Sequence, residues 1–401
     1  MLQTGAGSGI ILNHLRAHEH ASPRTRATSS MLWRTRYIRR VGRHDARMEH
    51  VTDTDRIRRT RGQLIFLREA LDDTESRAAQ AGVRVGQLAR VMRGCFVAAP
   101  VWDAWFPEQR LLARTIAVAE MNARFDPLFS HQSAAVLWGL PLFRVPDLRV
   151  HALTPAESPG RSSATVMRHA ALWHAEEETR IAGVRVTSLT RTVLDLARAA
   201  EPVTAIVAAD AALRALFTCR AGGRDEEAEE AWRSMQLRRL DEMPGGRGVR
   251  RGRSIIELAD GRSDSPAESV SRLYLAQLGV PVEIQVPVVG SNGAQYRVDF
   301  EFIGQCTFGE VDGRVKYLDP ALRGGRTAEE VVLQEKERED DIRGTTGNGL
   351  VRWGSAHLSG ARSLGMRLRA FGVRVPKLEG VVATGAARDR DPRRRERERF
   401  R

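Results

Sequence analysis

The chain has 401 residues, 42% of them hydrophobic, which is enough for two or three domains with buried cores. No run approaches the roughly 18 apolar residues of a membrane span. The three cysteines, Cys95, Cys219 and Cys306, show no paired spacing. The composition therefore predicts a soluble cytoplasmic protein and argues against a disulfide framework or a cysteine-rich zinc site.

The formal net charge of +13 lies mostly at the two ends of the chain. Residues 1–62 carry 13 Arg against 5 acidic residues, and residues 388–401 carry 8 Arg against 4. We expect residues 1–62 and 377–401 to be disordered basic segments that attract phosphate without sequence preference. Since residues 63–387 are almost neutral, any nucleic-acid surface of the folded part must be local.

Folded structure is expected to begin near Gln63, where QLIFLREALDD favours a short helix. A second helix is predicted from Val85 to Val91, and Arg93-Gly94-Cys95-Phe96-Val97 is typical of a turn followed by a strand. The order helix, turn, helix, Arg-Gly strand resembles the winged-helix N-terminus of AbiEi-type antitoxins.

The resemblance implies that residues 63–105 bind DNA with the second helix in the major groove. The alternative is a small helical cap with solvated arginines. The expected DNA contacts are Arg84, Gln87 and Arg90 on the helix and Arg93 at the wing.

Residues 106–218 alternate helices with short strands and resemble the α/β region that follows the winged helix in those antitoxins. Ser130 is a good N-cap for a helix that stops at Gly139, and strands are expected at 148–154 and 184–189. Helices are expected at 190–200 and 203–217. Arg191 and Asp195 are four residues apart, which predicts an ion pair on one helix face.

Four histidines in this region show no recognised metal-ligand spacing, and we interpret each as structural or exposed. They are His131, His151, His169 and His174.

Residues 219–253 are polar and rich in Gly and Arg, which indicates a mobile linker around a short helix near 226–240. The domain at 254–376 then opens with a helix at Ser-Pro-Ala-Glu-Ser. Ser265 as N-cap, Pro266 at the first helical position and Glu268 three residues after the cap form a capping box. This capping role alone is enough to explain why Glu268 stands at this position.

Three strands are expected next. The first is Val282 to Val289, and the second begins at Tyr296. The residues between them, Gly290-Ser-Asn-Gly293, are typical of a tight hairpin turn. Asp299 lies on the polar face of this second strand, and Glu310 and Asp312 share a face of the third. Hard oxygen ligands of this kind suit Mg²⁺. Alternatively, Asp299 pairs with a nearby Arg or Lys, and Asp312 opens the turn at Gly313.

The ordered motifs resemble the very-short-patch-repair-like branch of the PD-(D/E)XK nucleases over residues 265–357. The resemblance implies that Glu268, Asp299 and Glu310 are metal ligands. This chain has Asp312 where the superfamily pattern has Lys two residues after Glu, so Lys316 or Lys336 would have to serve instead. The implied catalytic set is Glu268, Asp299, Glu310, Asp312, Lys316 and Lys336.

A second capping box, Thr327-Ala-Glu-Glu330, opens a helix to about Arg343, and Leu350 to Trp353 supplies a last strand. The expected fold class is therefore mixed α/β with several domains. These are an N-terminal winged helix, a middle α/β region and a C-terminal restriction-endonuclease-like core of order αβββαβ.

Two functions remain open from the sequence. The first is a DNA endonuclease dependent on Mg²⁺ or Mn²⁺, in which the ion polarises the phosphate and activates a water. The second is a noncatalytic DNA-binding regulator or bacterial antitoxin with a toxin partner, which the Asp312 departure favours. Fold alone does not separate them.

Overall fold

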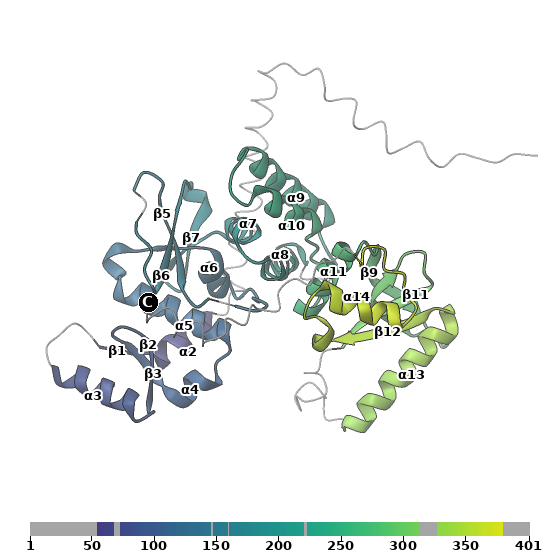
Figure 1. Ribbon diagram of the computed structural model, residues 1–401, viewed down its shortest axis with the longest axis horizontal. Coiled ribbons are helices and arrows are strands. Elements are labelled where there is room, and N and C mark those ends of the chain that lie inside the picture. The colour runs from purple at the N-terminus through teal and green to yellow at the C-terminus, as the bar shows by residue number, and fades with distance from the viewer. Residues whose placement is uncertain are drawn as a thin grey trace, which may run out of the picture. The chain divides into compact units, whose positions relative to one another are not determined.

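The computed structural model describes residues 54–67, 73–145, 147–158, 160–219, 223–312 and 327–379 (Figure 1). These residues form a mixed α/β structure with three β-sheets. Within the described ranges, no helix combines the length and apolar character that crossing a bilayer requires.

The N-terminal sheet has three strands in the order β1-β3-β2, all antiparallel. Ile57 is fully buried, and Cys95 and Val97 on the central strand are equally inaccessible. The elements are α2 (Thr54–Gln63), β1 (Ile65–Phe66), α3 (Asp73–Arg84), β2 (Leu88–Met92) and β3 (Cys95–Ala98).

Three expectations for this region are wrong. Helix α2 lies within the segment 1–62 that was expected to be disordered, and it ends at Gln63 instead of beginning there. Ile65–Phe66 is a strand, because a short apolar run is equally compatible with helix and strand, and residues 68–72 of the expected helix lie outside the described residues. The helix expected at 85–91 is replaced by a turn at 85–87 followed by strand β2. Gly86 adopts a left-handed φ of 72°, and the amide of Gln87 donates to the carbonyl of Gly82 at 2.9 Å. This hydrogen bond pattern is a Schellman cap, which ends α3 and frees Leu88 for the sheet.

The middle sheet has five strands in the order β6-β5-β4-β8-β7. As expected, Ser130 is the N-cap of α6, and Gly139 ends that helix with a φ of 78°. The indole of Trp138 donates to the carbonyl of Thr187 at 2.9 Å, which fixes α6 against β8. The strands are β4 (Leu128–Phe129), β5 (Val150–Pro155), β6 (Val166–Ala171), β7 (Glu178–Ile181) and β8 (Val184–Thr187). The helices are α4 (Ala99–Ala104), α5 (Pro107–Met121), α6 (His131–Trp138) and the short η1 (Ala123–Phe125) and η2 (Ala175–Glu177).

Four helices follow this sheet: α7 (Leu189–Ala199), α8 (Pro202–Phe217), α9 (Glu226–Asp241) and α10 (Val249–Leu258). The expected ion pair between Arg191 and Asp195 forms at 2.9 Å, and both residues are buried. Helix α9 confirms the short helix expected near 226–240, but this helix packs instead of lying in a mobile linker: Trp232 on α9 is fully buried, and its indole donates to the hydroxyl of Thr190. A helix that buries only one face can be as polar in composition as a loop, so composition alone does not distinguish the two.

The C-terminal sheet has the order β12-β11-β10-β9, with β12 parallel to β11 and the other pairs antiparallel. This arrangement confirms the expected three-stranded meander and the final strand. The elements are α11 (Pro266–Leu278), β9 (Val282–Val289), β10 (Gln295–Phe302), β11 (Thr307–Asp312), α13 (Ala328–Thr346), β12 (Gly349–Gly354), η3 (Ser355–His357) and α14 (Ala361–Ala370).

Helices contact this sheet through two apolar clusters. Ile342 on α13 packs with Val298 and Phe308 on the strands. Trp353 on β12 contacts Phe300 and donates from its indole to the hydroxyl of Ser271 on α11 at 2.8 Å. These contacts fix α11 and α13, the two helices that carry predicted site residues.

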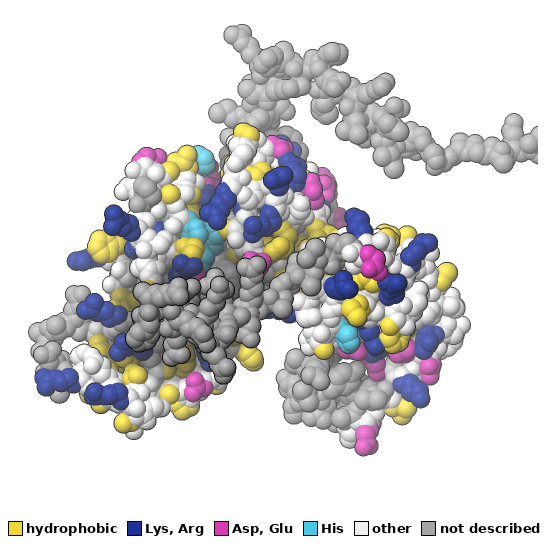
Figure 2. All heavy atoms as spheres, viewed as in Figure 1, with side chains coloured by type: hydrophobic (Ala, Val, Ile, Leu, Met, Phe, Trp, Pro, Cys, Tyr) yellow, Lys and Arg dark blue, Asp and Glu magenta, His cyan; other side chains and the backbone are white. Residues whose placement is uncertain are grey.

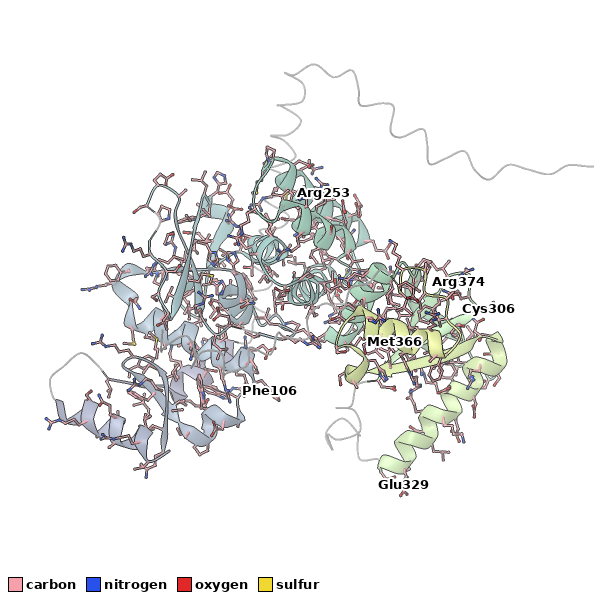
Figure 3. The ribbon with its side chains drawn as sticks, viewed as in Figure 1. Phe106, Arg253, Cys306, Glu329, Met366 and Arg374 are labelled. Atoms are coloured by element: carbon pink, nitrogen blue, oxygen red, sulfur yellow. The ribbon has the colours of Figure 1, made fainter. Side chains whose placement is uncertain are left out.

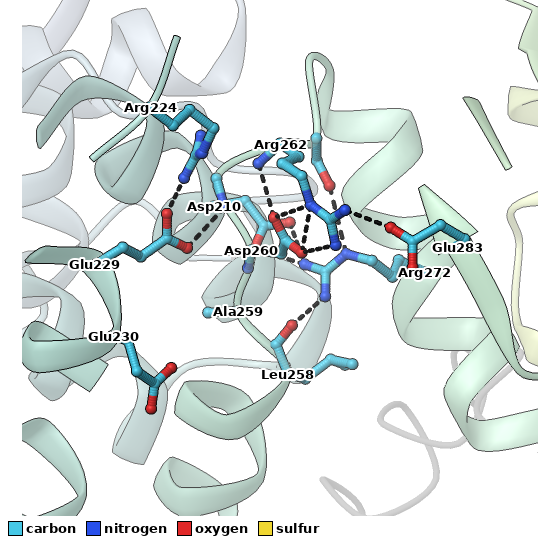
Figure 4. A network of polar contacts seen from close by, with 12 residues as sticks. Asp210, Arg224, Glu229, Glu230, Leu258, Ala259, Asp260, Arg262, Arg272 and Glu283 are labelled. Atoms are coloured by element: carbon cyan, nitrogen blue, oxygen red, sulfur yellow. Dashed lines mark hydrogen bonds and ion pairs between the residues drawn. The ribbon is translucent and has the colours of Figure 1, made fainter. Parts of the chain in front are cut away.

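A buried ion pair joins α8 to α11 (Figure 4). Arg272 donates to both oxygens of Asp210, at 2.7 and 2.5 Å, and the Asp260 amide donates to Asp210 Oδ1 at 2.8 Å. Burial raises the pKa of Asp210, and Arg272 partly offsets this rise. Arg262 pairs with Asp260 and Glu283 at the edge of the same network.

Candidate functional site

The predicted nuclease-like residues lie on neighbouring strands of the C-terminal sheet. Glu310 on β11 is directly paired in register with Arg352 on β12. Asp299 lies on β10 next to Phe300, which pairs with Gly309 of β11. The parallel β11–β12 pair therefore places an arginine beside the predicted central metal ligand.

Glu310 is 6% exposed, and arginines occupy both of its carboxylate oxygens. Oε1 lies 2.7 Å from Arg338 of α13, and Oε2 lies 2.7 Å from Arg352. A buried carboxylate needs a compensating partner, and two guanidinium groups supply it here. A metal ion would have to displace at least one of them to bind Glu310.

Arg352 is shared among four carboxylates. Besides Glu310, it lies 3.1 Å from Asp312, 2.5 Å from Glu335 and 3.2 Å from Glu339. The hydrogen bond of Glu335 and the surrounding negative charge raise the pKa of Arg352, although burial alone would lower it. Glu339 also pairs with Arg343 at 3.2 Å, so three arginines face four acids, which leaves a local excess of one negative charge.

The pKa of Asp312 responds to that excess. Burial raises it, Arg352 opposes the rise, and the negative charges of Glu310 and Glu335 add to it. Asp312 therefore behaves as a member of the arginine cluster, and its nearest described cation is Arg352 at 3.1 Å.

Asp299 and Glu268 have their own hydrogen-bond donors. Asp299 Oδ2 accepts from the Val311 amide at 2.8 Å, across the β10–β11 pair. Glu268 Oε1 accepts from the Ser265 hydroxyl at 2.7 Å, and Oε2 accepts from the Asp264 amide and the Gln285 side chain, both at 2.8 Å. Glu268 thus closes the start of α11, as the capping interpretation predicted, but through the residue before Ser265.

In the part of the chain that the structure describes, Glu268, Asp299 and Glu310 are not a group whose ligand oxygens all lie within 4.8 Å of one another. Each is held by a different set of donors. Lys336 is exposed on α13, and Lys316 lies outside the described residues. The roles of these residues in metal binding and catalysis stay predictions.

The four expected DNA-contact residues are all exposed in the N-terminal region. Arg84 ends α3, Gln87 is the last residue of the Schellman cap, Arg90 lies on β2, and Arg93 lies in the β2–β3 turn. Among described residues, 54–67 and 73–105 contain eight Arg against four acidic residues, a local net charge of +4. In the view of Figure 2, basic side chains outnumber acidic ones over this region.

A histidine cluster in the middle region was not predicted. His131 begins α6, while His151 and His169 lie on the parallel strands β5 and β6. One ring nitrogen of each lies within 4.8 Å of the others, and these three form the metal-competent group found among the described residues. The residues are 20 and 18 positions apart, so the pairing of β5 with β6 and the position of the start of α6 beside them bring the three rings together.

The three histidines are held in their neutral form. Burial and the neighbouring rings lower the pKa of His131 well below its usual value and that of His151 to about 4. Burial also lowers the pKa of His169. Neutral imidazole is the form that binds metal ions.

Comparison with known proteins gives two relatives in Mycobacterium tuberculosis. The chain is 29% identical over 219 residues to the uncharacterized protein Rv2248 of strain H37Rv and to the uncharacterized protein MT2308 of strain CDC 1551 / Oshkosh. Each match covers 54% of this chain and 71% of the relative. No family model matches the chain, and no solved structure matches it significantly.

Proposed function

We propose that the protein is a noncatalytic DNA-binding regulator, or an antitoxin of a bacterial toxin–antitoxin pair, that uses its N-terminal region to bind duplex DNA. The observation that carries the noncatalytic assignment is the pairing of both Glu310 oxygens with Arg338 and Arg352. A catalytic Mg²⁺ needs carboxylate oxygens free for coordination. The absence of Lys two residues after Glu310 supports the same conclusion.

The N-terminal sheet supports the DNA-binding part of the proposal. Helices α2 and α3, a three-stranded antiparallel sheet of order β1-β3-β2 and a turn between β2 and β3 support the proposal of a winged helix. In this proposal α3 replaces the segment 85–91 as the helix that enters the major groove. Arg84 and Arg93 would contact phosphates from the end of α3 and from the turn, and Arg90 from β2.

Binding is tested by fluorescence anisotropy of a labelled duplex titrated with the full chain over a series of salt concentrations. Replacing Arg84, Arg90 and Arg93 by Ala should lower the slope of log K against log salt by roughly three, about one per lost phosphate contact. The matched control replaces the exposed Arg362, Arg369 and Arg374 (Arg374 is labelled in Figure 3) and removes the same charge from the C-terminal region. An equal decrease of the salt slope in both triple variants, or no DNA binding by the wild type at low salt, would overturn the proposal.

A metal-dependent DNA endonuclease is the second candidate, because four carboxylates around three arginines leave one negative charge that a cation could neutralise. Supercoiled and mismatched DNA are incubated with the protein and Mg²⁺, Mn²⁺ or chelator. The regulator proposal expects no metal-stimulated nicking. Nicking that Glu310→Gln abolishes would establish the endonuclease instead.

A further inference from the structure

We propose that His131, His151 and His169 form a binding site for Zn²⁺ in the middle region. This site is independent of the DNA-binding proposal and lies on other elements than the Glu310 cluster. One ring nitrogen from each residue lies within 4.8 Å of the other two. Three imidazoles with a fourth position left for water is a ligand set that zinc adopts in proteins.

One pair of nitrogens has nearly the spacing of two ligands on one ion. His151 Nδ1 and His169 Nε2 are 3.0 Å apart. With zinc–nitrogen bonds of about 2.0–2.1 Å, two ligands of a tetrahedral ion are separated by about 3.3 Å. A small movement of either ring would therefore convert a nitrogen–nitrogen hydrogen bond into two metal bonds.

The third ring is oriented by a neighbouring hydroxyl. His131 Nδ1 lies 2.9 Å from Ser130 Oγ, and the His131 ring stacks on His169 with centroids 3.9 Å apart. If Nδ1 donates to this hydroxyl, Nε2 carries the lone pair that a metal needs. Such a hydrogen bond on the second nitrogen is the usual support of a metal-binding histidine.

The backbone at His131 is also unusual. Its φ is 51°, in the left-handed region that side-chain-bearing residues rarely adopt, and the residue is 8% exposed. Conformations of this kind persist where the surrounding structure fixes them, often at binding sites. At His131 this left-handed backbone conformation coincides with the stacking of the His131 ring on His169.

Of the three arginines that lower the pKa values of these rings, Arg149, Arg191 and Arg198, the first two are paired with carboxylates, which reduces their opposition to a cation. Arg191 pairs with Glu177 and Asp195, both at 2.9 Å, and Arg149 pairs with Asp147 at 2.5 Å. His151 and His169 are only half-buried, which gives an ion access from solvent. Imidazole ligands suit zinc and other late transition metals and disfavour Mg²⁺.

The test is calorimetric titration of the metal-stripped full chain with Zn²⁺, with the visible absorption of bound Co²⁺ as a second readout. His169→Gln should weaken the tightest zinc site by at least about tenfold, the lower range seen for changes around metal ligands, and remove the tetrahedral Co²⁺ bands. His174→Gln is the matched control, because His174 is exposed and outside the cluster. Zinc binding by the histidines that are not replaced is present in every variant, so it does not affect the comparison.

Circular dichroism confirms that each variant is folded, and His151→Gln replaces His169→Gln if the latter is not. Loss of the site in the cluster variant with retention in His174→Gln supports the proposal. Equal zinc affinity in the cluster variant and the wild type, or the absence of a tight site in the wild type, overturns it.

Discussion

The Glu310 cluster of the C-terminal sheet and the histidine cluster of the middle sheet both gather polar side chains on adjacent parallel strands, but their charges differ. Arginines occupy both oxygens of Glu310, at 2.7 Å each. In the histidine cluster the nearest partner of one neutral ring is another neutral ring. Resemblance to nucleases directs attention to the first cluster, whereas coordination chemistry favours the second.

The difference shows that residue type alone does not identify a metal site. Carboxylates are metal ligands only when their lone pairs are free, and a guanidinium beside them competes directly with the ion. Neutral imidazoles that face one another have no such competitor. The following predictions begin with a buried ion pair outside both clusters, between α8 and α11, and then test the contrast itself.

The Asp210–Arg272 pair should give the largest effect on stability. Its side chains are 1% and 7% exposed, so Arg272→Met leaves a buried carboxylate without its cation. We expect the free energy of unfolding, measured in urea, to fall by about 3–5 kcal/mol. Arg369→Met, which removes an exposed pair with Glu379, should change it by less than about 1 kcal/mol. Similar losses of unfolding free energy in both variants would contradict the assignment of Asp210–Arg272 as a stabilising buried ion pair.

Glu310→Gln should reduce stability by about 2–3 kcal/mol, below the full cost of breaking a buried pair because Arg338 and Arg352 are partly exposed. Urea unfolding measures the change. Glu329→Gln on the exposed start of α13 is the control and should have almost no effect (Figure 3). Unchanged stability after Glu310→Gln would mean that the arginine pairing does not hold this carboxylate.

The histidine cluster should make the stability of the metal-free protein depend on pH. The folded pKa of His151 is about 4, below its usual 6.5, so the unfolded chain binds this proton first as pH falls. Its contribution is therefore complete above pH 6.5 and is lost as pH falls toward 4. Residues around the rings that shift their pKa values are Asp147, Arg149, Arg191 and Arg198.

Urea unfolding across this pH interval, with chelator present, measures the dependence. His151→Gln should flatten it by on the order of 1–3 kcal/mol, and His174→Gln should leave it unchanged. A pH dependence that is identical in wild type and His151→Gln would show that the ring is not held neutral in the folded state.

The smallest effect is expected at the start of α11. Ser265→Ala removes the hydroxyl that accepts from the Glu268 amide at 3.2 Å and should cost about 1 kcal/mol. Glu268→Gln keeps a hydrogen-bond acceptor there and should cost less. If Glu268→Gln instead abolished metal binding measured by calorimetry without changing stability, Glu268 would be a ligand and not a cap.

Local sequence signals determined much of the C-terminal fold. Ser265 and Thr327 start helices α11 and α13, and the alternation from Tyr296 to Phe302 defines β10. Such caps and periodicities act through bonds between residues close in the chain. The N-terminal predictions were wrong where an apolar run was short. The helix predicted near 226–240 is confirmed as α9, but it is not part of a mobile linker, because its Trp232 is buried despite the polar composition of the segment.

What only the tertiary structure decided is which side chains meet. Glu310 meets Arg352 because β12 returns parallel to β11, and Arg338 reaches it from α13. His131, His151 and His169 meet because β5 and β6 pair while α6 begins beside them. No spacing along the chain encodes these contacts, because they depend on strand register and helix packing between distant segments. The sequence by itself supplied the acids and the histidines, and the fold paired the acids with arginines and left the histidines facing one another.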